Sequence, residues 1–387
     1  MKIIHVITPG DHFSPLTGSA IPTVVHGISA AMSIRGVVSS VVVDKTTYKD
    51  RYDSCTIIDV QYDLQGLSVS QRISDVLCGF TFLKRPHIGQ TYKVVRKALE
   101  AEINPVVVYY NAVYPAVQHK VENPGHTVVS WWQNDLTRTF SPRELNNILS
   151  KLDGVICCSD FIRSKLVSKI SKRMNSKVFT ILNGGPEPVA SETPRKLGSR
   201  PRILFFGRLV PQKGVHVLLD AYLSDKYLRD SCELLVMGSR GFSSTEPMSK
   251  YQENLHCRVK TCDVGTINFL PFQNRHSINK FIDSADVVVV PSVFEEPFGL
   301  VVLEANARGV PVVHSRRGGL LEASGGNGLV FDSEDSIGLA DNLRYLLSNG
   351  DYYAKMSNRS LDWARLSTWH VRADSVCHVI QSIRYNK

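Results

Sequence analysis

Short apolar runs alternate with polar loops and with helix-period segments along most of the chain. The runs KIIHVIT, SSVVVD, NPVVVYYN, HTVVSWW and DGVICCS are rich in β-branched residues and too short for ordinary helices, so they predict buried strands. Helical stretches separate several of them, and the first follows the loop PGDHFSPLTGSA. Because strands that alternate with helices form parallel sheets, the amino-terminal half is predicted to be an α/β layer structure.

A second series of such units begins after residues 190–201, a polar stretch with two prolines and a glycine that is typical of an interdomain linker. The segment RILFFGRLVPQKGVHVLLDAYL predicts a strand, a glycine turn and a helix. Between Asp286 and Gly319 the pattern gives a strand, an acidic loop, a helix and the strand VPVV. In such units the loop and the helix start lie at the carboxyl edge of the sheet, where open α/β folds bind ligands.

The composition fits a reduced α/β protein with two domains. The chain has 387 residues, of which 43% are hydrophobic, and it contains no apolar run of about 18 residues that would span a membrane. The start MKIIHVITPG has no signal-peptide core, so we expect a cytoplasmic location. The eight cysteines, with Cys157 and Cys158 adjacent in an apolar strand, fit reduced thiols. His256, Cys257 and Cys262 lack a second ligand pair at zinc spacing, so no metal site is expected.

The formal net charge of +9 favours an anionic partner. No nucleic-acid motif is present, so we do not expect nucleic-acid binding. The densest positive set lies in a predicted helix over residues 159–177, in which Phe161, Leu166 and Ile170 give a partial apolar stripe. Its cations are Lys165, Lys169, Lys172, Arg173 and Lys177. Residues 163–177 are therefore either a solvated helix face or a peripheral contact with an anionic membrane surface.

Two carboxylates and two cations stand in loops of the carboxyl-terminal half. Glu296 lies in the acidic loop EEPFG, and Glu304 lies eight residues further on, in the helix. A carboxylate accepts hydrogen bonds from two neighbouring hydroxyls, as on a sugar edge, although surface helices carry glutamates in any case. Arg208 and Lys213 bracket a glycine turn at a helix start, where cations oppose the helix dipole. A polyanion bound between them would relieve that conflict.

These motifs resemble those of the retaining GT-B glycosyltransferases of the group 1 or family 4 type. The spacing of Glu296 and Glu304 is similar to the family's E-x7-E signature, and GRLVPQKG is similar to its GR-x4-KG motif. The stretch GGLLE at residues 318–322 resembles its GG-x-x-E loop.

The resemblance implies an α/β fold with two Rossmann-like, doubly wound domains that face a cleft. It places an acceptor-side domain in residues 1–190 and a nucleotide-sugar domain in residues 191–361. A carboxyl-terminal helix at about residues 362–387 is expected to join the first domain.

The resemblance also implies roles for individual residues. Arg208 and Lys213 are expected to hold the donor diphosphate. Glu296 is expected to hold the donor sugar and Glu304 the ribose, and the catalytic set is Glu296, Arg208 and Lys213. The complete donor-binding set is Gly18, Gly207, Arg208, Lys213, Glu296, Phe298, Gly299, Leu300 and Glu304.

One loop departs from the family pattern. Where many relatives place a histidine, this chain has Gln133, Asn134 and Asp135, so a histidine role is not carried over. Asn134 and Asp135 are the acceptor candidates, and Asp135 either binds an acceptor hydroxyl or caps the segment that follows it.

Within the family the chain resembles bacterial lipopolysaccharide core transferases, notably the N-acetylglucosamine transferases. The expected activity moves a hexose or N-acetylhexosamine from a UDP-sugar to a lipopolysaccharide core or other cell-surface glycan, at the cytoplasmic face of the inner membrane. No D-x-D motif is present, so metal-independent transfer without a cofactor is expected. The alternatives are a GT-B sugar-nucleotide epimerase, a phosphorylase and a non-enzymatic polyanion-binding protein.

Overall fold

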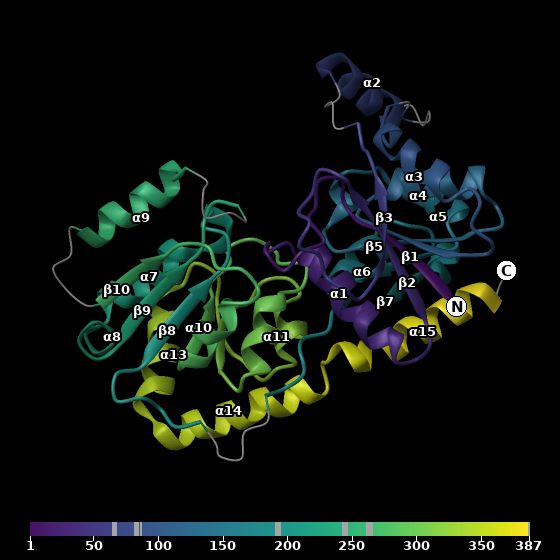
Figure 1. Ribbon diagram of the computed structural model, residues 1–387. Coiled ribbons are helices and arrows are strands. Elements are labelled where there is room, and N and C mark those ends of the chain that lie inside the picture. The colour runs from purple at the N-terminus through teal and green to yellow at the C-terminus, as the bar shows by residue number, and fades with distance from the viewer. Residues whose placement is uncertain are drawn as a thin grey trace. The chain divides into compact units, whose positions relative to one another are not determined.

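The computed structural model describes residues 1–63, 68–80, 85, 87–189, 195–241, 247–260 and 266–385 (Figure 1). The chain forms two compact units. Unit 1 comprises Met1–Ser14, Ser19–Asn183 and His370–Lys387, and unit 2 comprises Pro15–Gly18 and Gly184–Trp369. The sequence placed the change of domain at residue 190 and the returning helix at about 362, whereas the units change after Asn183 and after Trp369.

Unit 1 is built on a seven-stranded sheet with the order β3-β2-β1-β4-β5-β6-β7. All of its neighbouring strands pair in parallel. The strands are β1 (Lys2–Val6), β2 (Val38–Asp44), β3 (Thr56–Val60), β4 (Val106–Tyr110), β5 (Thr127–Trp132), β6 (Gly154–Cys157) and β7 (Val178–Thr180). The five apolar runs noted in this half form β1, β2, β4, β5 and β6, and β4 and β5 are buried at every position.

Helices flank this sheet (Figure 1). They are α1 (Ala20–Ser33), α2 (Val69–Phe80), α3 (Lys93–Ala98), α4 (Val113–Glu122), α5 (Pro142–Lys151), α6 (Asp160–Val167) and α15 (Trp369–Tyr385). Short 3₁₀ turns cover Gln90–Tyr92, Leu136–Arg138 and Lys172–Lys177. Helix α15 packs onto β6 at Gly154, because a Cβ at that glycine would lie 2.7 Å from Cδ1 of Ile383.

Unit 2 is built on a six-stranded parallel sheet with the order β10-β9-β8-β11-β12-β13. Its strands are β8 (Arg202–Phe206), β9 (Glu233–Met237), β10 (Thr266–Leu270), β11 (Val287–Val290), β12 (Val312–Ser315) and β13 (Leu329–Phe331). Its helices are α7 (Val215–Ser224), α8 (Lys226–Ser231), α9 (Lys250–Lys260), α10 (Ile278–Ser284), α11 (Leu300–Asn306), α12 (Leu320–Ser324), α13 (Ser336–Ser348) and α14 (Gly350–Arg365). The turn Pro211–Lys213 is a 3₁₀ helix.

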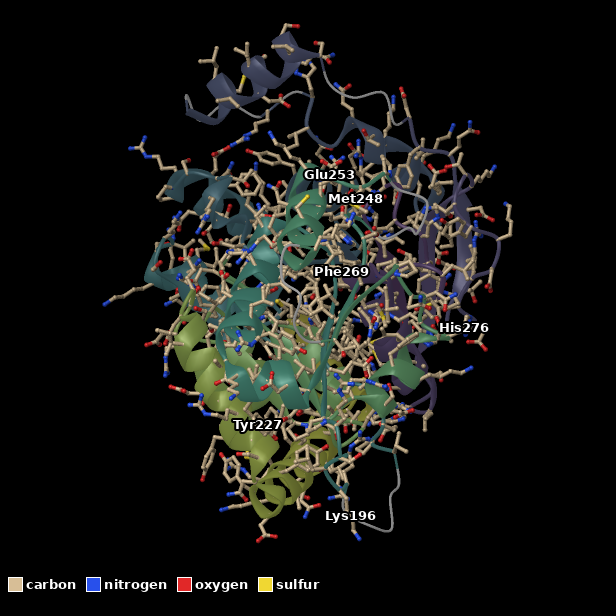
Figure 2. All side chains as sticks on the ribbon, turned by 90° about the vertical axis from the view of Figure 1, so that its left-hand side faces the viewer. Lys196, Tyr227, Met248, Glu253, Phe269 and His276 are labelled. Atoms are coloured by element: carbon tan, nitrogen blue, oxygen red, sulfur yellow. The ribbon has the colours of Figure 1, made fainter. Side chains whose placement is uncertain are left out.

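The core of unit 2 joins the sheet to α7 and α13. Val289 of β11, Leu218 of α7 and Leu343 of α13 are fully or almost fully buried in it. Helix α9 adds a ring contact, in which the rings of His256 and Phe269 lie with centroids 4.0 Å apart and are tilted by 31°. Phe269 is labelled in Figure 2.

The strand order locates the ligand-binding edge of each sheet. In unit 2 the chain leaves β8 toward β9 and β10 on one side and later fills β11, β12 and β13 on the other. The loops that follow β8 and β11 therefore diverge at a topological switch point, which is where open α/β sheets bind ligands. In unit 1 the corresponding point lies between β1 and β4. The expected pair of Rossmann-like, doubly wound sheets is confirmed.

The helix predicted over residues 159–177 is shorter than expected. Ser159 caps it by accepting a hydrogen bond from the Ile162 amide at 3.2 Å, but α6 ends at Val167. The apolar stripe is also different, because Ile162 and Leu166 are the buried residues of α6 whereas Phe161 is partly exposed. In the described ranges, no helix is long and apolar enough to cross a membrane.

Candidate functional site

The loop from β8 to α7 carries the two predicted cations. Arg208 is exposed just after β8, and Lys213 ends the 3₁₀ turn that leads into α7. Gly214 follows at a φ of +71°, and a Cβ there would lie 1.8 Å from the carbonyl oxygen of Pro291. Only glycine therefore lets this loop pack against the end of β11.

The loop from β11 to α11 brings Glu296 to Lys213. The Lys213 ammonium lies 2.6 Å from Oε1 of Glu296, and it also stands 5.1 Å from the ring centroid of Phe294. Glu296 is 5% exposed, so its charge is almost fully removed from water. The amide of Val293 donates to the Gln212 carbonyl at 3.0 Å, which joins the two loops through their backbones. In this structure Glu296 thus supplies the negative charge that Lys213 needs at the start of α7.

The second carboxylate, Glu304, is paired with a residue from a third loop. The Arg275 guanidinium, which follows β10, forms an ion pair with Glu304 of α11. The Arg275 amide also donates to the carbonyl of Pro15 at 2.9 Å, within unit 2. Arg275 therefore joins α11 to the short segment Pro15–Gly18.

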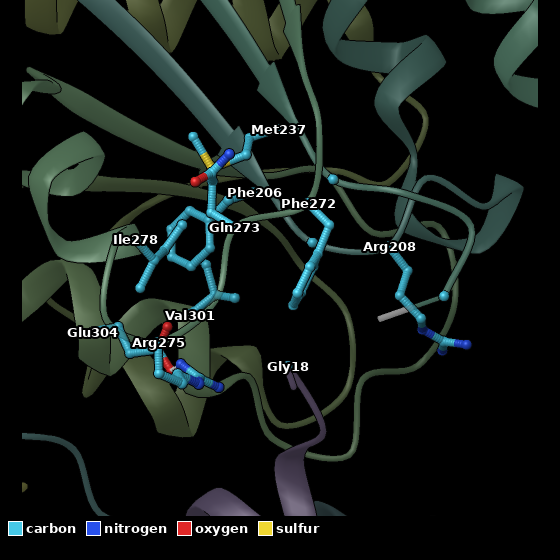
Figure 3. Close-up of a pocket in the computed structure, with 13 residues that line it drawn as sticks. Gly18, Phe206, Arg208, Met237, Phe272, Gln273, Arg275, Ile278, Val301 and Glu304 are labelled. Atoms are coloured by element: carbon cyan, nitrogen blue, oxygen red, sulfur yellow. Dashed lines mark hydrogen bonds and ion pairs between the residues drawn. The ribbon is translucent and has the colours of Figure 1, made fainter. Parts of the chain in front are cut away.

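These loops enclose a pocket in unit 2 (Figure 3). Arg275 and Glu304 lie together on one side of it, and Arg208 lies on the other. The lining residues are Gly18, Phe206, Gly207, Arg208, Met237, Gly238, Gly241, Phe272, Gln273, Arg275, Ile278, Val301 and Glu304. The apolar side chains suit a flat ring, the carboxylate suits neighbouring hydroxyls and the guanidinium suits an anion.

The structure sorts the predicted donor residues into three groups. Gly18, Gly207, Arg208 and Glu304 line the pocket. Lys213 and Glu296 form the ion pair on the loops that follow β8 and β11.

The remaining predicted donor residues form the start of α11. Phe298 is buried, Gly299 is the residue before the helix with a φ of +119°, and Leu300 is its first residue. A methyl group at Gly299 would lie 2.6 Å from Cδ2 of Leu320, so the backbone passes close to α12.

The two acceptor candidates lie in unit 1 after β5. Asp135 caps the 3₁₀ turn that follows, because its Oδ1 accepts from the amide and hydroxyl of Thr137 at 3.1 and 2.6 Å. Its Oδ2 lies 3.0 Å from the Lys165 ammonium. Burial acts to raise the pKa of Asp135, but the hydrogen bonds from Thr137 and Lys165 outweigh it and hold the pKa below its usual range. Of the two roles considered for Asp135, the structure shows the cap.

Asn134 is exposed, and its amide donates to Oδ1 of Asn111 at 3.2 Å. Gln133, in the loop that departs from the family pattern, is buried and exchanges two amide hydrogen bonds with Asn183, of 3.1 and 2.8 Å. Gln133 is therefore held by another side chain of unit 1.

Within the described part of the chain, no three His, Cys, Asp or Glu side chains gather where they could hold a metal ion. The ring of His256 instead lies against the ring of Phe269. Cys262, which was considered with it, lies outside the described residues.

Sequence reasoning missed the pocket residues contributed by β9 and by the loop after β10. Met237, Phe272, Gln273 and Arg275 line the pocket but stand in no recognised motif. They lie at the end of β9 or just after the end of β10, the two strands on one side of β8. The order of the strands in the sheet would therefore have pointed to these residues, whereas their spacing along the sequence did not.

Solved structures share this fold. Sucrose-phosphate synthase from Thermosynechococcus elongatus matches with a TM-score of 0.75 at 18% sequence identity, over 100% of both chains. The Anabaena protein HepE in complex with UDP-glucose matches with a TM-score of 0.69 at 17% identity, over 99% of this chain and 100% of that one. With its two parallel sheets, the chain has the GT-B fold of glycosyltransferases.

Comparison with known sequences indicates which glycosyltransferases the chain resembles. Residues 189–363 match the family model described as glycosyl transferases group 1, so this part of the chain is similar to group 1 glycosyltransferases. Among curated proteins it is similar to lipopolysaccharide 1,2-N-acetylglucosaminetransferase of Salmonella typhimurium, with 24% identity over 331 residues. That match covers 83% of this chain and 82% of the relative.

Proposed function

We propose that the protein moves a hexose or N-acetylhexosamine from a UDP-sugar to a glycan acceptor, with retention of the anomeric configuration. The observation that carries the proposal is the set of two cations and two carboxylates on the loops that follow β8 and β11 and on helix α11, at the switch point of the unit 2 sheet. The UDP-glucose bound by the structural neighbour from Anabaena supports a UDP-sugar donor. The similarity to the Salmonella enzyme supports an acceptor in the lipopolysaccharide core or another cell-surface polysaccharide.

The charges suit the departure of a diphosphate. When the bond from the anomeric carbon to the diphosphate oxygen breaks, the electron pair stays on the leaving group. Arg208 and Lys213 would stabilise this negative charge by preorganised electrostatics, without a metal or a cofactor. Glu296 would accept hydrogen bonds from the donor sugar and Glu304 from the ribose, while the apolar side of the pocket would receive the base.

The first test is a thermal-shift screen with UDP, GDP, ADP and their common sugars, with and without EDTA. The proposal expects stabilisation by a UDP-sugar that is unchanged by EDTA, because bound ligand stabilises the folded state by mass action. Stabilisation that EDTA abolishes would contradict metal independence. Absence of any shift in folded protein would favour a polyanion-binding protein, and release of an isomerised sugar without acceptor would favour an epimerase.

Replacement of the cations tests their role directly. Arg208→Ala and Lys213→Ala are each expected to lower turnover by the equivalent of about 3 kcal/mol, the scale of losing one preorganised donor at the transition state. Steady-state rates of sugar transfer would measure it, and the anomeric configuration of the product by NMR would test retention. Near-normal turnover in both variants would contradict the assignment.

The acceptor and the membrane contact belong to unit 1. Asn134 and Asp135 remain the acceptor candidates, although the cap and the ion pair already occupy Asp135.

In the segment 163–177, Lys165, Lys169 and Lys177 donate to groups within the protein. A peripheral contact at the cytoplasmic face of the inner membrane would therefore depend on the exposed Lys172 and Arg173. Its test is sedimentation with anionic vesicles, where Lys172→Gln with Arg173→Gln should abolish binding.

A further inference from the structure

Ser292 lies between the end of β11 and Glu296 and is fully buried. Its hydroxyl donates to Oε1 of Glu296 at 2.6 Å. Its carbonyl oxygen accepts from the hydroxyl of Ser315, the last residue of β12, at 2.7 Å, and Ser315 is also fully buried. Two hydrogen bonds, one at the carbonyl and one at the hydroxyl of Ser292, therefore connect the end of β12 to the Glu296 carboxylate.

The backbone of Glu296 is fixed as well. The amide of Gly319 donates to the Glu296 carbonyl at 2.8 Å. Gly318 has a φ of +55°, and a Cβ on it would lie 2.2 Å from the same carbonyl oxygen. Because Gly318 and Gly319 hold the main chain of Glu296 in place, only the side-chain torsions of Glu296 remain to be fixed.

Both side-chain donors of Glu296 bond to the same oxygen. Ser292 and Lys213 each lie 2.6 Å from Oε1, and the described residues give Oε2 no hydrogen-bond partner. Oε1 is therefore the anchored oxygen, and Oε2 is the one that can accept from a ligand hydroxyl.

Lys213 has a second use under the proposed function, because it would bind the donor diphosphate. An ammonium shared between a carboxylate and a diphosphate holds each of them less firmly than it would hold one alone. The diphosphate cannot compete for the Ser292 hydroxyl in this way, because Ser292 is fully buried and its carbonyl is held by the Ser315 hydroxyl. A buried carboxylate that loses part of its ion pair depends on its remaining hydrogen bond.

We propose that Ser292, supported by Ser315, is a positioning residue that keeps the Glu296 carboxylate in place when the donor diphosphate engages Lys213. The inference rests on the proposed function, and it separates the two tasks of the site. Lys213 binds the diphosphate, whereas Ser292 orients the Glu296 carboxylate toward the donor sugar.

The test compares Ser292→Ala with the wild type for binding of UDP, binding of the UDP-sugar and turnover. The affinity for UDP should change less than about twofold. The UDP-sugar affinity or the turnover should fall about tenfold to a hundredfold, the effect of losing a hydrogen bond to a charged group. Ser315→Ala should move the same quantities in the same direction by less, and it keeps the test available if Ser292→Ala does not fold.

Ser357→Ala is the matched control. Ser357 is also a fully buried serine, and its hydroxyl donates to the Gly309 carbonyl at 2.7 Å, but it lies on α14 away from these loops. This variant should keep both affinities and turnover. A loss in Ser357→Ala equal to that in Ser292→Ala would make the effect a general cost of removing a buried hydroxyl, and would overturn the inference.

A double-mutant cycle tests whether Ser292 acts through Glu296. In a Glu296→Ala background, Ser292→Ala should add less than about twofold, because the side chain that Ser292 positions is already gone. Full additivity would overturn the inference. If Ser292→Ala binds the UDP-sugar and turns it over as well as the wild type does, only the inference is overturned. If the wild-type protein binds no nucleotide sugar, the proposed function is overturned as well.

Discussion

At the scale of single residues, close packing between backbones decides what the site tolerates. Gly214 and Gly318 are examples, since each has a positive φ and each lies against a carbonyl of the β11–α11 loop. The motifs GRLVPQKG and GGLLE thus contain glycines for a reason that concerns the protein itself, in addition to any contact with a ligand.

Gly214→Ala should destabilise the protein by more than about 3 kcal/mol, because the left-handed conformation and the contact with the Pro291 carbonyl both penalise a Cβ. Gly326→Ala is the control, since Gly326 has a φ of +73° but no atom within 4 Å of a Cβ. It should cost only about 1 to 2 kcal/mol. Denaturant unfolding of the two variants would measure the difference, and equal losses would contradict the packing argument.

The sequence singled out Arg208, Lys213 and Glu304 because each stands in a motif that local spacing reveals. Arg208 and Glu304 line the pocket and Lys213 pairs with Glu296, while their roles in binding a donor stay predictions. Arg275 and Ser292 were not predicted, because their partners are Glu304 and Glu296 and both contacts depend on folded loops. The ion pair between Lys213 and Glu296 was not predicted either, because the sequence analysis assigned the negative charge next to Lys213 to a bound ligand alone.

At the scale of elements, buried histidines connect the central strands of unit 1 to the helices on them. His5 of β1 lies 3.1 Å from the Tyr110 hydroxyl of β4 and 3.2 Å from the Ser29 hydroxyl of α1. His119 of α4 lies 2.9 Å from the Tyr109 hydroxyl and 2.9 Å from Nδ1 of His126. Burial lowers the pKa of His5 to about 3, and burial followed by the charge of His126 lowers the pKa of His119 to about 3.

These two histidines should make the protein less stable in mild acid. Below pH 6.5 the unfolded chain takes up protons on them, whereas the folded protein does not until the pH approaches 3. Each histidine therefore contributes a loss of up to about 1.4 kcal/mol per pH unit within that window. His119→Gln should reduce the slope of unfolding free energy between pH 6 and pH 5, and an unchanged slope would contradict the argument.

Elements were predicted well where one kind of residue dominates a run. The first strand predicted after Asp286 is present as β11 (Val287–Val290), because four consecutive valines are compatible with a buried parallel strand. Strand β3 was not predicted, since TIIDV is an edge strand with only Val60 buried and has no continuous apolar run. The helix predicted over 159–177 was too long because repeated serines and lysines continue its composition after its buried residues end at Leu166.

At the scale of the whole molecule, the pocket and the ion pair both belong to unit 2. Binding of UDP should therefore slow amide hydrogen exchange first in the loops after β8, β10 and β11. Peptides of the central strands β4 and β5 of unit 1, which are already fully buried, should be unaffected. Hydrogen-exchange mass spectrometry with and without UDP would test this, and protection confined to unit 1 would contradict the placement of the donor site.

The return of α15 to unit 1 has a consequence for the order in which the protein can fold during synthesis. Unit 1 contains segments that are translated before and after residues 184–369, and Ile383 fills the space above Gly154 of β6. A ribosome therefore delivers nearly all of unit 2 before it delivers the helix that completes unit 1. The sheet of unit 1 is translated first, but the helix that packs on it is translated last, so β6 lacks its contact with α15 at Gly154 while unit 2 folds.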